Sequence, residues 1–392
     1  MEKVRFGIIG VGNMGSSHAK KFLEGKVQNG VLTAICDLKQ AKMDKVAALD
    51  GGADVAQFTD YKQMLASGIC DAVIVAVPHY YHPPLVIDAL NAGLNVVCEK
   101  PAGVYTKQVK EMNEVAKKRG TLFTMMLNQR TNCVYRKMRE MVMDGTIGEI
   151  KRVNWIITTW YRSQSYYDSG DWRATWRGEG GGVLFNQCPH QLDLLQWITG
   201  MMPEKVRSFC HFGKWHDIEV EDDVTVYMEF PNGATGVFVT STGDTPGTNR
   251  FEILGNNGKL VCENIGKNED RLTFTKLKTP EREFNATYQG GFGEPEKEVI
   301  NVETDGENPQ HVGILNNFAN AILGLEPLFV NGTEGLNGVE LMDSMLLSTW
   351  LDQEVKLPID DDLYLAELNK RIATGRRKEG ADVVLDTSNT YR

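Results

Sequence analysis

The sequence has few of the features that mark secreted, membrane-spanning or zinc-binding proteins. Its seven cysteines form no Cys-x-x-Cys pair, and neighbouring cysteines are more than 20 residues apart, which argues against zinc ribbons and redox motifs. The purest apolar run, residues 72–77, is far too short to cross a bilayer. Residues 1–9 do not have the pattern of a signal peptide. We therefore expect a cytoplasmic protein with reduced thiols and no membrane partner.

The chain also lacks an excess of positive charge. Lys and Arg number 42 against 52 Asp and Glu, so the net charge is −10. Nucleic acids attract basic surfaces, so we expect no nucleic-acid partner. His211 and His216 are five residues apart, on opposite faces of any strand, and no cysteine joins them, so we expect no metal site.

The chain is long and has an ordinary globular composition. Its 392 residues, 42% of them hydrophobic, suffice for two or three domains that need no disulfide or metal to fold. Residues 4–9 form a β-rich run that ends in the pattern G-x-G-x-x-G, and residues 16–22 have a helical pattern. The sequence therefore predicts a strand, a glycine turn and a helix, as in dinucleotide-binding folds.

Each part of this motif has a physical role. Gly10 permits the tight turn, Gly12 lets the backbone approach a pyrophosphate, and Gly15 lets helix and strand pack closely. The helix N-terminus supplies amide donors for the phosphates. The predicted cofactor-binding residues of this region are Gly10, Gly12, Asn13, Met14, Gly15 and Asp37.

Asp37 follows the second apolar run, 22 residues after Gly15, where a carboxylate can accept hydrogen bonds from ribose hydroxyls. It would repel a 2′-phosphate, which favours NAD. Lys39 nearby leaves NADP open. A glycine turn without any nucleotide is the alternative interpretation.

Two further strands are predicted at residues 72–77 and 94–98. Pro78 follows the first, and Glu99, Lys100 and Pro101 follow the second. Ligands of doubly wound sheets bind beyond the carboxyl ends of the strands. Gly10, Asp37, Pro78 and Lys100 should therefore line one crevice, where Pro78 and Lys100 are also predicted to contact the cofactor.

These elements together resemble the glucose–fructose oxidoreductase/inositol dehydrogenase (Gfo/Idh/MocA) family. The resemblance rests on the glycine turn, the strand followed by Pro-x-x-x-His, and Glu-Lys-Pro, and it covers about residues 3–358. It implies an α/β chain: an N-terminal Rossmann domain with a doubly wound parallel sheet, then an α+β domain with an open, mostly antiparallel sheet. It also implies hydride transfer between nicotinamide and a sugar or polyol, and adds His82 and Glu99 to the cofactor contacts.

The predicted domain boundaries follow from this comparison and from the residue patterns. We expect a dinucleotide-binding domain at 1–127, a substrate and oligomerisation domain at 128–334, a closing helix and strand at 335–358, and an extension at 359–392. The extension is interpreted as a surface segment, with a role in oligomer contacts as the alternative.

The second domain has antiparallel patterns. Apolar and polar residues alternate over 223–230, and Asn232-Gly233 predicts a hairpin before residues 235–240. A second turn is expected at 256–258, between strands at 251–254 and 259–262. Family members form dimers or tetramers through the open sheet face, and we expect a homodimer or homotetramer here. Residues 221–223 are interpreted as a solvated turn.

Residues 155–177 hold four of the seven tryptophans, interleaved with tyrosine, arginine and aspartate. Aromatic rings stack on the C–H faces of sugars, and Arg and Asp bind the hydroxyls. We predict carbohydrate-binding residues here and in the next segment: Tyr161, Arg162, Tyr167, Trp172, Arg173, Trp176, Asn186 and His190. Simple core packing of the aromatic residues is the alternative.

The predicted catalytic residues are Lys100, His190 and Asn186. A glycine run at 180–182 precedes a predicted helix that places 186 and 190 on one face. In the family, a histidine matching His190 handles the hydroxyl proton, Asp193 matches a trailing aspartate, and position 186 is often Asp. We interpret His190 as the base, Lys100 as the group that stabilises developing alkoxide, and Asn186 as an orienting residue.

Three functions fit these residues. The first is an NAD(P)-dependent sugar or polyol dehydrogenase. The second is redox-neutral glycoside cleavage through transient oxidation and elimination. The third is a dinucleotide-binding sensor without turnover, which the presence of both Lys100 and His190 disfavours.

Overall fold

A computed structural model describes residues 3–266, 269–376 and 378 of the chain. The chain divides into two compact units. The first comprises Met1–Asn128, Arg177–Gly180 and Pro309–Val339, and the second Gln129–Trp176, Gly181–Asn308 and Glu340–Arg392. The domain boundaries given above stay predictions.

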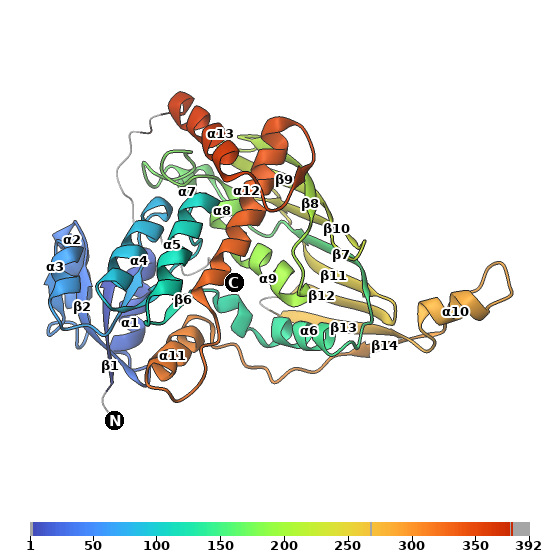
Figure 1. The fold of residues 1–392 in the computed structure, drawn as a ribbon, viewed down its shortest axis with the longest axis horizontal. Coiled ribbons are helices and arrows are strands. Elements are labelled where there is room, and N and C mark those ends of the chain that lie inside the picture. Colours follow the sequence, from blue (N-terminus) through green and yellow to red (C-terminus); the bar gives the residue numbers. More distant parts are fainter. Residues whose placement is uncertain (1–2, 267–268, 377, 379–392) are drawn as a thin grey trace. The chain divides into compact units, whose positions relative to one another are not determined.

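The first unit contains a six-stranded parallel sheet (Figure 1). The strand order is β3-β2-β1-β4-β5-β6, so successive strands are added on one side of β1 up to β3 and on its other side from β4 onward. The strands are β1 (Val4–Ile9), β2 (Gly30–Cys36), β3 (Ala56–Phe58), β4 (Ala72–Val75), β5 (Asn95–Cys98) and β6 (Phe123–Met125). The helices are α1 (Asn13–Leu23), α2 (Gln40–Ala47), α3 (Tyr61–Ala66), α4 (His82–Asn91), α5 (Thr106–Lys118) and α11 (Gln310–Ile322).

Helices cover both faces of this sheet. The side chain of Phe6 in β1 packs on Phe22 of α1, with ring centroids 4.8 Å apart, and faces Phe318 of α11 at 6.4 Å. The next residue, Gly7, faces the other way, where an added Cβ would lie 3.2 Å from Met64 of α3. All four residues of β4 are fully buried, as expected for a central parallel strand. The predicted doubly wound Rossmann fold is confirmed.

The second unit contains a nine-stranded sheet of order β14-β13-β12-β11-β7-β10-β9-β8-β15. Among the strands of this sheet that the structure describes, only β7 and β10 pair in parallel. The strands are β7 (Ile150–Ile157), β8 (Lys205–Phe212), β9 (Glu221–Glu229), β10 (Thr235–Ser241), β11 (Asn249–Gly255), β12 (Gly258–Gly266), β13 (Glu269–Leu277), β14 (Lys297–Asn301) and β15 (Val355–Lys356). The remaining helices are α6 (Cys133–Met143), α7 (Gln164–Tyr167), α8 (Val183–Asn186), α9 (Pro189–Thr199), α10 (Glu281–Thr287), α12 (Gly335–Leu351) and α13 (Asp361–Thr374).

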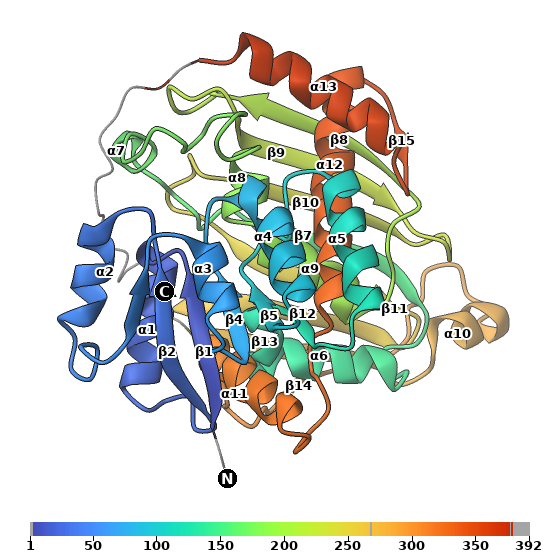
Figure 2. The same cartoon turned by 60° about the vertical axis from the view of Figure 1, so that its left-hand side comes forward.

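Helix α12 lies along one face of this sheet (Figure 2), and alternate residues of the strands are exposed on the other face. Val226 and Met228 of β9 are fully buried, whereas Tyr227 between them is 42% exposed. On the covered face, the amide of Ser208 in β8 donates to Ser348 of α12 at 3.0 Å. The predicted hairpin is present, because β9 pairs with β10 around Gly233, whose φ is +81°. The open, mostly antiparallel sheet is therefore confirmed.

The expected extension begins with α13. Tyr364 and Leu368 on this helix are fully buried, and Tyr364 stacks on Trp350 of α12 at 5.4 Å. The first part of the segment thus packs into the second unit. Residues 379–392 of the extension lie outside the described residues.

Candidate active site

The glycine loop after β1 fits a dinucleotide pyrophosphate. Gly10 has φ +88°, and an added Cβ would lie 2.4 Å from the carbonyl oxygen of Ala76. At Gly15 an added Cβ would lie 1.8 Å from the carbonyl oxygen of Gly10. Gly12 differs, because apart from its neighbours in the chain no described atom lies within 4 Å of the position that its Cβ would take. Two glycines therefore build the turn, and the third leaves open space at the N-terminus of α1, where Asn13 and Met14 begin the helix.

Asp37 connects the end of β2 to this loop. One carboxylate oxygen accepts the backbone N–H of Val11 at 3.0 Å, and the other accepts the N–H of Lys39 at 3.0 Å. The side chain is half-buried. A carboxylate thus stands beside the glycine loop, where it can accept from ribose hydroxyls and disfavour an added phosphate.

Glu99, at the end of β5, is held by a buried histidine. His18 of α1 lies 2.6 Å from one carboxylate oxygen, and the other accepts the backbone N–H of Lys100 at 3.2 Å. Burial raises the pKa of Glu99, but the bond to His18 and the fields of His18, His311 and Lys100 outweigh it, lowering the pKa to about 2. Burial lowers the pKa of His311, on α11, to about 4. Glu99 therefore anchors the backbone that carries Lys100.

His82 ties together the segments that follow β4 and β5. Its Nδ1 lies 2.6 Å from the carbonyl oxygen of Pro101, and its Nε2 lies 2.7 Å from that of Val77. The side chain is buried, and this burial lowers the pKa of His82. Pro78 follows directly after Val77 and precedes the turn into α4. The role of His82 visible in the structure is to hold the backbone that follows β4 next to the backbone that follows β5.

The carboxyl ends of β1, β2, β4 and β5 therefore bring four predicted features to one edge of the first sheet. The glycine loop, Asp37, Pro78 and Lys100 follow strands that are neighbours in the order β2-β1-β4-β5. This is the edge where doubly wound sheets bind ligands.

In the second unit, the expectation that one helix carries both residue 186 and residue 190 is wrong. Asn186 ends α8 and His190 lies in the first turn of α9, with a break at Gln187 and Cys188. Pro189 explains the break, because it has no N–H to donate to the preceding turn. Residues 186 and 190 therefore do not share one continuous helical face.

Asn186 belongs to a polar network around Tyr166. The hydroxyl of Tyr166 donates to Oδ1 of Asn186 at 3.2 Å and accepts from Arg173 at 3.0 Å and from Gln187 at 3.4 Å. Gln187 also donates to Oδ1 of Asn186 at 3.2 Å. His190 is 8% exposed.

The aromatic segment divides between surface and interior. Tyr161 is 51% exposed, and Arg162, Trp172 and Arg173 are half-buried. Tyr167 is buried and donates to Thr242 at 2.7 Å, while Trp176 is buried against Phe212 and Trp350. The first group can meet a ligand directly, whereas the contacts of Tyr167 and Trp176 are those of core residues.

Two acidic segments have structural partners. Asp193 pairs with Arg130 through two bonds of 2.6 and 2.8 Å, with both side chains buried. The solvated turn expected at 221–223 is wrong, because Glu221 and Asp222 are fully buried. Glu221 accepts the N–H groups of Gly182 and Leu184 at 2.7 and 3.0 Å, which fixes the glycine run before α8.

Sequence reasoning missed His18, His311, Tyr166, Gln187 and Glu221. His18 lies three residues after Gly15, on the face of α1 that turns toward the sheet, which was an available signal. His311 is far from the motifs in sequence and had none.

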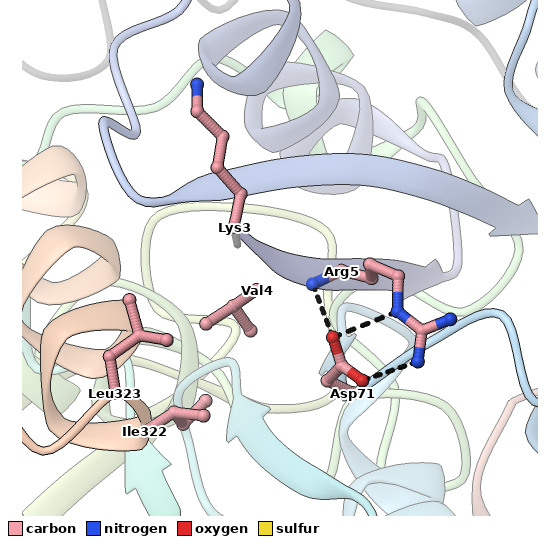
Figure 3. A pocket seen from close by; sticks show the side chains of 6 residues that line it. All are labelled: Lys3, Val4, Arg5, Asp71, Ile322 and Leu323. Carbon is pink, nitrogen blue, oxygen red and sulfur yellow. Dashed lines mark hydrogen bonds and ion pairs between the residues drawn. The ribbon is translucent and has the colours of Figure 1, made fainter. Parts of the chain in front are cut away.

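Other possible sites carry less. Within the described ranges, no group of three or more His, Cys, Asp or Glu could hold a metal ion. No described helix is long and apolar enough to cross a membrane. A hollow of about 320 Å³ is lined by Lys3, Val4, Arg5, Asp71, Ile322 and Leu323 (Figure 3). It lies where β1 begins, at the sheet edge opposite the glycine loop, and Asp71 is already bound by Arg5 at 2.6 Å.

The fold and the strand-end residues define a dinucleotide-dependent oxidoreductase. Two family descriptions match the chain: "Oxidoreductase family, NAD-binding Rossmann fold" over residues 4–127, and "GFO/IDH/MocA C-terminal domain" over residues 135–261. The chain belongs to the Gfo/Idh/MocA family of NAD-binding oxidoreductases and is an enzyme of that class.

Similar proteins act on cyclic alcohols and sugars. The chain is 26% identical to myo-inositol 2-dehydrogenase of Thermotoga maritima over 277 residues, 69% of this chain and 78% of the relative. It is 29% identical to D-glucoside 3-dehydrogenase of Escherichia coli over 248 residues, 59% and 68% of the two chains. The structure of WlbA dehydrogenase from Bordetella pertussis, a complex with NADH and UDP-GlcNAcA, matches with a TM-score of 0.76 at 25% identity, covering 92% of this chain and 100% of that one. These relatives favour neither glycoside cleavage by elimination nor a sensor.

Proposed function

We propose that this protein is an NAD-dependent dehydrogenase that interconverts a ring hydroxyl and a ketone on a sugar or polyol. The observation that carries the proposal is the edge of the first sheet, where the glycine loop, Asp37 and Lys100 follow neighbouring strands. The dehydrogenases of inositol and of glucosides among its relatives support this substrate class.

The chemistry divides between the cofactor and the side chains. NAD, held by the glycine loop with Asp37 at the ribose, supplies the hydride acceptor. Oxidation also removes the hydroxyl proton, and we assign that proton to His190 as the general base. The ammonium of Lys100 hydrogen-bonds the same oxygen and stabilises the developing alkoxide. Asn186 orients His190 or binds a neighbouring hydroxyl.

Glu99 and His18 give Lys100 its fixed backbone. An ionised Glu99 accepts the N–H of Lys100, and His18 holds that carboxylate at 2.6 Å. The main chain at Lys100 therefore does not depend on the substrate for its position, which is the preorganisation that an electrostatic role needs.

The assembly and the cofactor preference complete the proposal. Ile156, Phe209 and Tyr227 on the open sheet face are 42%, 52% and 42% exposed, which supports a homodimer or homotetramer formed through that face. Asp37 supports NAD over NADP. We place the enzyme in the cytoplasm, without a nucleic-acid or membrane partner.

Lys100→Ala and His190→Ala test the assignment. Each should lower kcat about 10²- to 10⁴-fold, the usual contribution of a general acid or base. Saturable NAD binding, measured by quenching of tryptophan fluorescence, should persist in both variants. Arg119→Gln, on an exposed loop bound to Asn91, is the control and should leave turnover unchanged. Near-normal turnover of Lys100→Ala on a true substrate would overturn the mechanism.

A further inference from the structure

A cluster of arginine and aromatic side chains lies beside Asn186. We define the arginine–aromatic cluster as Trp160, Arg162, Tyr166, Trp172 and Arg173. The guanidinium of Arg173 lies 4.7 Å from the ring centroid of Tyr166 and 4.6 Å from that of Trp172. The guanidinium of Arg162 lies 5.2 Å from the centroid of Tyr166 and 5.9 Å from that of Trp160. Two cations therefore share the ring of Tyr166.

Neither cation has an acidic partner in the described part of the chain. Arg162 donates to the carbonyl oxygens of Trp160 and Tyr161 at 3.4 and 2.9 Å, and Arg173 donates to the hydroxyl of Tyr166. Acidic residues are not scarce, because the net charge is −10. Two half-buried guanidinium groups near one ring repel each other, and an anion between them would relieve that repulsion.

The nearby carboxylates do not supply this anion. Asp168 lies 3.7 Å from Lys378 and accepts from Gln164 at 3.1 Å. Asp171 is exposed and forms no ion pair with either arginine of the cluster. The positive charge of the cluster is therefore not neutralised by its own segment.

The cluster also has spare donor capacity. The indole Nε1 of Trp160 is buried, and among the described atoms it has no hydrogen-bond acceptor. Buried donors of this kind are costly unless something accepts from them. An excess of donors with two positive charges fits a ligand rich in oxygen acceptors and carrying negative charge.

We propose that the arginine–aromatic cluster binds a carboxylate or phosphate group of the substrate, so that the enzyme acts on acidic sugars. This inference rests on the proposed dehydrogenase function. The hydroxyl of Tyr166 connects the cluster to Asn186 at 3.2 Å, which places the bound anion next to the residue that meets the sugar ring. Arginine suits this task because its planar fork can bind two oxygens of a carboxylate or phosphate.

Three matched probes test the inference: D-glucose, D-glucuronate and D-glucose 6-phosphate. Each is titrated into the NAD-loaded enzyme, and affinity is read from tryptophan fluorescence, since Trp160 and Trp172 lie in the cluster. At least one anionic probe should bind tenfold or more tightly than glucose, and added salt should weaken it. The anionic probe that binds more tightly than glucose identifies whether the cluster recognises a carboxylate or a phosphate. Equal affinity for all three probes, or no binding of either anion, would overturn the inference.

Variants connect the gain to the two arginines. Arg162→Gln and Arg173→Gln should each weaken binding of the favoured anion roughly 10- to 100-fold, the loss expected for a hydrogen bond to a charged group, and should weaken glucose binding by a clearly smaller factor. Arg282→Gln, an exposed arginine paired with Glu149, is the matched control and should change neither. Retention of the gain in both cluster variants, with thermal unfolding unchanged, would also overturn the inference.

Turnover separates this inference from the proposed function. If neutral sugars reduce NAD as efficiently as their acidic counterparts, the dehydrogenase assignment stands and the anion site fails. If the anion binds through both arginines but no sugar in a wider panel reduces NAD, the anion site stands and the dehydrogenase assignment fails.

Discussion

Replacing Asp193 with Asn should destabilise the second unit far more than an ordinary charge removal. Asp193 and Arg130 form a two-pronged pair at 2.6 and 2.8 Å, and their side chains are 4% and 1% exposed. Gln196 also donates to Asp193 at 3.1 Å. The variant keeps the size of the side chain but leaves the guanidinium of Arg130 buried without its counter-charge.

The expected loss is about 3–5 kcal/mol of unfolding free energy, the cost of breaking a buried pair by removing one partner. Asp305→Asn is the matched control, because Asp305 pairs with Arg136 of α6 at 2.9 Å while the two side chains are 52% and 37% exposed. Its loss should be far smaller, because exposed ion pairs contribute little to stability. Urea unfolding followed by tryptophan fluorescence measures both, and Trp197, 5.3 Å from the guanidinium of Arg130, reports the local change.

The two variants also separate structure from catalysis at Asp193. Folded Asp193→Asn enzyme should keep most of its kcat at low temperature, because the carboxylate is fully engaged with Arg130 and Gln196. A stability loss no larger than that of Asp305→Asn would refute the reasoning. Intact stability with a large fall in kcat would show that Asp193 acts in the reaction.

Three further outcomes follow from the first unit. Gly12→Ala should keep its thermal unfolding temperature, because the added Cβ enters open space, but it should lose NAD affinity in fluorescence titrations, because that space is where the pyrophosphate is expected. Gly15→Ala should unfold at a lower temperature, because the added Cβ meets a carbonyl oxygen at 1.8 Å. Burial lowers the pKa of His311 in the folded chain to about 4, below its usual 6.5, so the unfolded chain takes up a proton first as the pH falls. The free energy of unfolding should therefore decrease by up to about 3 kcal/mol as the pH falls from 6.5 to 4, and the decrease should be smaller in His311→Gln. Asp37→Ser should raise the KM for NAD about tenfold or more and lower the ratio of NAD to NADP activity; an unchanged ratio would contradict the assignment.

The first sheet was predictable because its signals are local. The spacing of the glycines predicts the turn after β1, and the apolar run at 72–77 contains the fully buried β4 (Ala72–Val75). The hairpin at Gly233 was equally local, since two turn residues separate two alternating segments. These patterns depend on neighbours a few residues apart.

Sequence reasoning failed mainly where residues far apart in the chain determine the burial and the partners of a side chain. The sequence around Glu221 is typical of an exposed acidic turn. In the structure its carboxylate is buried and accepts two N–H groups from the segment that begins with the glycine run, some 40 residues earlier. The helix break at Pro189 is different, because it is a local signal that the expectation of one helix carrying residues 186 and 190 overlooked. The bond between His18 and Glu99 joins residues 81 positions apart, and no periodicity in the sequence indicates it.

The measurement that tests the central claim most directly is an absorbance scan for reduced nicotinamide. The enzyme is incubated with NAD or NADP and a panel of inositols, neutral sugars, uronates, sugar phosphates and glycosides. We predict that reduced nicotinamide accumulates with NAD and at least one cyclic substrate, and that Lys100→Ala abolishes the signal while still binding NAD. Saturable NAD binding without reduction by any member of the panel would contradict the dehydrogenase assignment.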